Sequence, residues 1–108
     1  MKEKDRIVLG YVLEGKLNTM ANSIEIAINK ILEKNNIRPA RMLGEKITQV
    51  SGVIKNRELV RDLREFNKIW NIIKHGSSEE KDHIKLKNLD ITKRFTKVIN
   101  ELISVYSS

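Results

Sequence analysis

The sequence lacks several features on which common site chemistries depend. It contains no cysteine, so neither a disulfide nor a thiolate metal site can form. Its two histidines, His75 and His83, lie eight positions apart with a glycine between them, and the HExxH pattern is absent. Glycine-rich phosphate loops, nucleophile elbows and dinucleotide fingerprints are absent as well. We therefore expect neither a metal nor a cofactor.

The sequence also lacks a long hydrophobic run. The charged N-terminus leads into apolar residues, but Glu14, Lys16, Asn22 and Glu25 interrupt them. Neither a signal peptide nor a membrane span fits this pattern. The absence of cysteine is compatible with a reducing compartment. We expect a cytoplasmic protein with no membrane partner.

Positive charge is what the chain has in excess. Its 108 residues include 21 Lys+Arg and 14 Asp+Glu, which gives a formal net charge of +7. Hydrophobic residues make up 40% and charged residues 32%, as in a single small globular domain spanning residues 1–108. A basic chain is suited to an acidic partner, of which nucleic acid is the most common. The bases are spread along the chain, so solubility alone is the alternative explanation.

Apolar residues recur at three- and four-residue spacing in four segments, which predicts four amphipathic helices. The segments are residues 5–34, 39–54, 56–76 and 90–106. We expect Pro39 in the first turn of the second helix, and Asn56 and Asp90 as N-caps of the third and fourth. No segment alternates as a strand does. The sequence therefore predicts an all-α protein, an antiparallel four-helix up-down bundle.

The stretch between residues 76 and 89 is polar and has few apolar anchors. Ser77 and Glu80 have the spacing of a capping box, which indicates a short helical turn there. We expect the remainder to form a connection between the third and fourth helices.

The third predicted helix separates its side chains most clearly. Five apolar residues fall within a sector of about 80° at 100° per residue: Leu59, Leu63, Phe66, Trp70 and Ile73. Four polar residues occupy a comparable sector on the other side: Arg64, Lys68, Asn71 and His75. We therefore expect the first set to pack in the core and the second to form one continuous polar face.

This polar face has the residue types of a ribonuclease site. An imidazole can accept or donate a proton at the ribose hydroxyl, a cation can hold the phosphate, and an amide can orient either. His75, Asn71 and Lys68 are the candidate catalytic residues, and Arg64, Lys68 and Lys74 the candidate nucleic-acid contacts. The alternative is structural. A His-Gly pair often ends a helix, with the cation near the last carbonyls and glycine in a left-handed cap.

The stretch Phe66–Gly76 resembles the motif helix of HEPN domains, small all-α bundles found among prokaryotic toxin and phage-defence ribonucleases. In that family four to six residues separate an Arg from the motif His, often with a polar residue directly after the Arg and a Lys-His-Gly or Ala-His-Gly ending. Asn71 and His75 match the polar residue and the His. The nearest Arg position holds Trp70, and the longest spacing falls on Lys68, which lacks the bidentate fork of Arg.

The resemblance implies a metal-independent ribonuclease fold that acts as a homodimer through the third helix, with Asn71 and His75 near the twofold axis. Val53, Val60 and Ile72 lie off the main stripes and are candidates for that interface. Three functions stay open: an unusual ribonuclease, an inactive relative that binds RNA, nucleotide or a cognate protein, and a non-enzymatic helical interaction module. A DNA-binding helix-turn-helix around residues 47–53 is a further alternative.

Overall fold

The computed structural model describes residues 3–108, with side chains from residue 13 onward. Its five α-helices are α1 (Glu3–Lys34), α2 (Leu43–Ser51), α3 (Arg57–His75), α4 (Ser78–Lys85) and α5 (Asn88–Ser107). No strand is present in residues 3–108. The predicted all-α class is confirmed. The predicted four-helix bundle is not, because a fifth helix is present.

The additional helix is α4, in the stretch that the sequence predicts to be mainly a connection. A capping box starts it: Ser77 Oγ accepts a hydrogen bond from the Glu80 backbone N–H at 3.2 Å, and Glu80 Oε1 accepts one from the Ser77 N–H at 3.1 Å. Ile84 is its buried residue. The cap was visible in the sequence. The single apolar residue after the cap was too weak a signal to predict a helix of eight residues.

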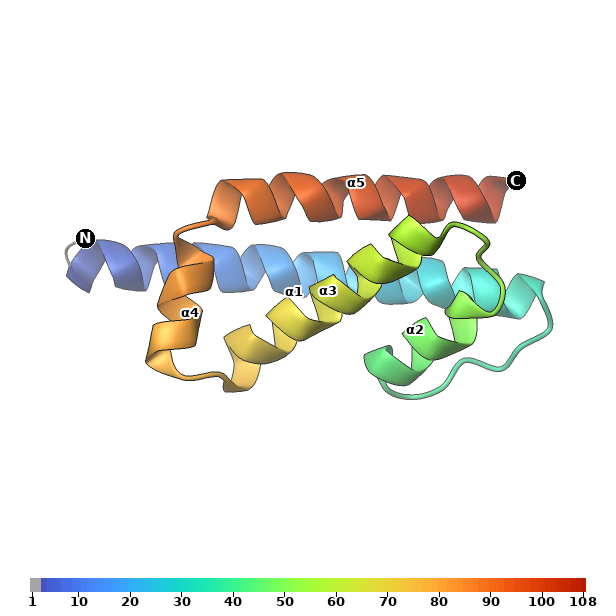
Figure 1. The fold of residues 1–108 in the computed structure, drawn as a ribbon, viewed down its shortest axis with the longest axis horizontal. Coiled ribbons are helices and arrows are strands. Elements are labelled where there is room, and N and C mark those ends of the chain that lie inside the picture. The colour runs from blue at the N-terminus through green and yellow to red at the C-terminus, as the bar shows by residue number, and fades with distance from the viewer. Residues whose placement is uncertain (1–2) are drawn as a thin grey trace.

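Helices α1 and α5 lie side by side and run in the same direction (Figure 1). Their C-terminal ends are joined, since Lys34 Nζ donates hydrogen bonds to the backbone oxygens of Tyr106 at 2.7 Å and Ser108 at 3.0 Å. An up-down bundle of four helices would make its first and last helices antiparallel. With five helices, α3 runs back across this pair and α4 crosses their other end (Figure 1).

Asn36 determines how the chain leaves α1. It takes the left-handed conformation, with φ 61°, and the N–H groups of Ile37 and Asn36 donate to the carbonyls of Leu32 and Glu33. These two bonds form a Schellman motif, which asparagine tolerates better than most residues. The chain therefore leaves α1 at a fixed angle and enters a loop.

Pro39 lies within this loop, residues 37–42, and not in the first turn of α2 as predicted. The side chain of Gln49 fixes the loop against α2. Its Oε1 accepts a hydrogen bond from the Ala40 N–H at 2.8 Å, and its Nε2 donates one to the Arg38 carbonyl at 3.0 Å. The two bonds satisfy backbone groups of the loop, which no helix pairs. The helix consequently begins only after the loop.

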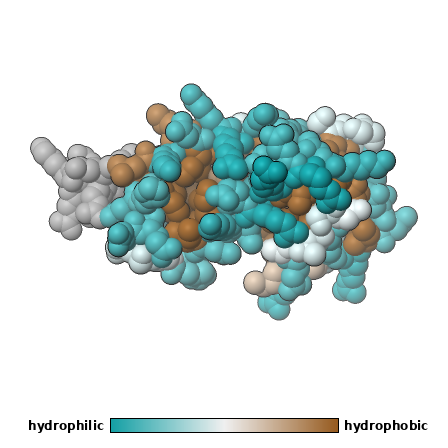
Figure 2. All heavy atoms as spheres, in the orientation of Figure 1, coloured by the Kyte–Doolittle hydropathy of each residue, from teal (hydrophilic) through white to brown (hydrophobic). Residues whose placement is uncertain are grey.

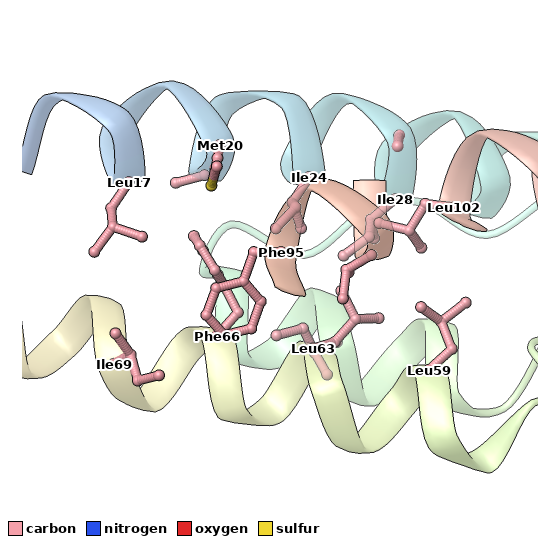
Figure 3. Close-up of a cluster of buried hydrophobic side chains, with 14 of the residues drawn as sticks. Leu17, Met20, Ile24, Ile28, Leu59, Leu63, Phe66, Ile69, Phe95 and Leu102 are labelled. Carbon is pink, nitrogen blue, oxygen red and sulfur yellow. The ribbon is translucent and has the colours of Figure 1, made fainter. Parts of the chain in front are cut away.

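The core forms where α1, α3 and α5 meet (Figure 3). Side chains of α1 such as Leu17, Ile24 and Ile28 face those of α3, and all three are fully buried. Phe66 of α3 and Phe95 of α5 meet edge to face, with ring centroids 5.0 Å apart and planes at 84°. Both rings are fully buried. Such a pair contributes about 0.5–1.5 kcal/mol beyond the burial of its area.

Hydrophilic side chains cover much of the face seen in Figure 2, and apolar side chains show between them in patches. None of the helices within the described residues is both long and apolar enough to cross a membrane.

We expect Phe66→Ala to lower the free energy of unfolding by about 3–5 kcal/mol, because it empties a fully buried site and removes one ring of the aromatic pair. Urea denaturation followed by circular dichroism measures the change. Leu89→Ala is the control, since Leu89 is 71% exposed. Equal losses for the two variants would contradict the position of Phe66 at the centre of the core.

Candidate functional site

The packing of α3 decides which of its side chains face outward. Asn56 Oδ1 caps the helix by accepting from the Leu59 N–H at 3.1 Å, as predicted. Leu59, Leu63 and Phe66 are fully buried. The polar face is therefore turned outward, and its four predicted members are all exposed: Arg64, Lys68, Asn71 and His75.

These four side chains line one open groove of about 660 Å³. Helix α2 contributes Gly44 and Ile47 to the groove, and the start of α4 contributes Glu80. The remaining lining residues come from α3 and its C-cap: Asn67, Ile72 and Gly76. The structure thus brings together all three candidate catalytic residues, and it places the candidate phosphate contact Arg64 beside them.

A glycine keeps the groove open on the α2 side. A Cβ atom at Gly44 would lie 3.3 Å from Asn67 Nδ2, closer than most such contacts. A larger side chain on α2 would therefore push against α3 or fill the space between them. Glycine leaves the side chains of α3 accessible.

The groove is positively charged. Arg64 and Lys68 form no ion pair with any described side chain, so their charges are available to a ligand. Glu80 is the one carboxylate among the lining residues. Its Oε1 already accepts hydrogen bonds from the backbone N–H and the hydroxyl of Ser77, both at 3.1 Å. This arrangement can bind an anion while amide and imidazole groups contact its neighbouring atoms.

Lys74 lies apart from the groove. Its Nζ is 5.3 Å from the centroid of the Trp70 ring, a cation–π contact, and it is not among the groove residues. Trp70 is half-buried and packs against the core. Trp70 therefore has a packing role in this chain.

The second histidine lies in a different cleft. His83 lines a hollow of about 370 Å³ between α3, α4 and α5, in which Lys87 and Arg94 stand beside Glu65 and Asp90. Arg94 forms a 2.8 Å ion pair with Asp62. This hollow shares Lys68 and Ile72 with the α3 groove, but His83 is not among the residues that line that groove. Within the described part of the chain no three histidine or carboxylate side chains gather as metal ligands would.

Sequence reasoning did not place Gly44, Asn67 or Glu80 in the site, although all of them line the groove. A helical wheel would have found Asn67, because it lies four residues before Asn71 and eight before His75. Gly44 and Glu80 had no comparable signal, since their position depends on how α2 and α4 pack against α3.

Gly76 ends α3, but not in the left-handed conformation considered above. Its φ of −73° and ψ of 171° are extended. The need for glycine is steric: a Cβ atom here would lie 2.6 Å from the carbonyl oxygen of Ile72 and 2.8 Å from its Cγ2. The Gly76 N–H donates to that same carbonyl at 2.7 Å. The close approach turns the chain directly after His75 and forms the end of the groove.

One expectation about a dimer interface is wrong. Val60 is only 6% exposed and belongs to the core, so it is not available to a second subunit. Val53 and Ile72 are partly buried and pack against the same core. The free surface of α3 is thus made mainly by its polar residues.

We expect Gly76→Ala to destabilise the fold by about 1–3 kcal/mol, because the new methyl group must displace the backbone of Ile72. Gly15→Ala is the matched control. Gly15 lies within α1, and a methyl group added to it would meet nothing within 4 Å, so this change should stabilise by up to about 1 kcal/mol. Thermal unfolding of both variants measures the effects. A Gly76→Ala variant as stable as the wild type would contradict the steric role.

The chain matches no protein-family model, no curated protein and no solved structure. We therefore infer its function from the residues that line the groove and from their geometry.

Proposed function

We propose that this protein binds RNA along the groove of α3, as an HEPN-like domain whose motif arginine is replaced, in a toxin–antitoxin or defence setting. The observation that carries the proposal is the placement of two cations, two amides and an imidazole in one open groove. They come from Arg64, Lys68, Asn67, Asn71 and His75, all on one helix.

The shape and charge of the groove suit a chain-like anion. The lining residues of α3 run from Arg64 to Gly76, so an extended strand can lie along the helix. Arg64 and Lys68 are one turn apart and exposed, and each can contact a phosphate and release a counterion. The formal charge of +7 adds long-range attraction for a polyanion.

The amide groups beside the cations favour RNA over duplex DNA. Amide side chains can pair with base edges and with the 2′-hydroxyl, which single-stranded or looped RNA presents to a protein surface. Reading of duplex DNA by a helix-turn-helix would use the N-terminal residues of a recognition helix. In this protein the groove follows the C-terminal part of α3 instead.

Binding is better supported than cleavage. Cleavage of RNA through its 2′-hydroxyl needs one group to remove a proton and another to protonate the leaving oxygen. The groove of one chain holds a single imidazole, and Glu80 is engaged with Ser77. A homodimer through α3 is therefore part of the proposal, since a twofold axis beside His75 would supply a second imidazole.

The first prediction concerns the cations. We expect the double variant Arg64→Ala/Lys68→Ala to bind single-stranded RNA at least about tenfold more weakly, and the slope of log K against log salt to fall by about 0.7 for each phosphate that the protein no longer neutralises. Fluorescence anisotropy of a labelled oligonucleotide at several salt concentrations measures both quantities.

The matched control is Lys93→Ala/Lys97→Ala, which removes the same charge from exposed positions on α5. If both double variants lose the same affinity, net charge and not the groove binds the RNA. An absence of RNA binding by the wild type would overturn the proposed function.

The second prediction separates binding from catalysis. Wild-type protein and a His75→Ala variant are incubated with structured RNA, and the products are resolved by gel electrophoresis. An active enzyme would cleave only in the wild-type sample. We expect both proteins to bind RNA and neither to cleave it, because the groove lacks the motif arginine and Lys68 has no bidentate fork to replace it. Cleavage by the wild type alone would assign His75 a catalytic role.

A further inference from the structure

A second groove lies between α1 and α5, where the two helices run side by side (Figure 1). Its volume is about 260 Å³, and its lining is mainly apolar: Ile26, Ala27, Ile99, Ile103 and Tyr106. None of these residues lines the α3 groove. The RNA site therefore makes no use of this surface.

Apolar exposure is concentrated on this second groove. Ile26 is 57% exposed, Ile103 51% and Tyr106 40%. They account for three of the six large hydrophobic residues that are exposed in the described part of the chain. An isolated exposed leucine or isoleucine is ordinary, whereas a contiguous group around a hollow marks an interaction site.

The charge of the groove is of one sign. Lys30 is its charged lining residue, and no described carboxylate lines it. Lys30 makes no ion pair or hydrogen bond with a described residue, so its charge is free for a partner. Lys34 stands at one end, with its Nζ 5.3 Å from the centroid of the Tyr106 ring. A partner that covers the groove is most complementary to it if carboxylates flank the partner's apolar contacts.

We propose that the α1–α5 groove docks an amphipathic helix of a partner protein, one with an apolar stripe flanked by Asp or Glu. A hollow between two parallel helices can take apolar side chains that a third helix presents at i, i+3, i+4 and i+7. Carboxylates on the flanks of the stripe then meet Lys30. A second copy of this chain is less well matched at this groove, because it would bring its own Lys30 to the contact.

The test uses a fluorescein-labelled synthetic peptide of about five helical turns, with leucines at helical spacing and glutamates on both flanks. Two comparison peptides carry lysines in place of the glutamates, or the same residues in scrambled order. Fluorescence anisotropy gives each Kd. We expect saturable binding of the acidic peptide and at least about tenfold weaker binding of the other two.

Variants of the protein locate the site. Ile26→Gln/Ile103→Gln should weaken binding of the acidic peptide at least about tenfold, whereas Leu86→Gln/Leu89→Gln should not, because this pair is at least as exposed but lies outside the groove. Lys30→Glu should weaken the acidic peptide and strengthen the lysine peptide. Circular dichroism confirms that each variant is folded.

Three results would overturn the proposal. The acidic peptide shows no saturable binding, or the glutamate and lysine peptides bind equally well. Alternatively, sedimentation equilibrium of the protein alone shows a dimer that Ile26→Gln/Ile103→Gln converts to monomer, which would assign the groove to a second copy of the chain.

Discussion

The burial of one side of α3 against α1 and α5 is the interaction on which the rest of the structure depends. The edge-to-face contact of Phe66 with Phe95 lies within that interface, where both rings are fully buried. Because side chains on a helix are fixed in their angular order, burying Phe66 also determines that Arg64, Lys68 and His75 point away from the core. The packing that buries Phe66 therefore also exposes the polar side chains that line the groove.

The groove itself needs more than an exposed helix face. Helix α2 must approach α3 closely enough to form a wall, and Gly44 permits this without filling the space. At the other end, the tight contact of Gly76 with Ile72 turns the chain so that α4 begins beside His75. Both positions need glycine because it has no side chain. A Cβ atom at Gly44 would approach Asn67 of α3, and one at Gly76 would approach Ile72 of α3.

The two grooves are chemically distinct, and they lie on different helix pairs. The α3 groove combines cations with amides and an imidazole, which suits a hydrated polyanion. The α1–α5 groove combines branched aliphatic side chains and a tyrosine with a lysine, which suits a folded apolar surface bearing carboxylates. No residue lines both grooves, so a ligand that contacts one lining leaves the other lining uncovered.

The sequence by itself determined the all-α class, the long first helix, the cap at Asn56 and the division of α3 into a buried and a polar side, because helical periodicity and capping are local properties. Only the tertiary structure decided the parallel course of α1 and α5 and the walls of the groove. It also placed Pro39 in a loop and Val60 in the core. Each of these depends on contacts between residues distant in sequence, such as the bonds of Lys34 to the end of α5 and of Gln49 to the loop after α1. No local pattern in the chain encodes them.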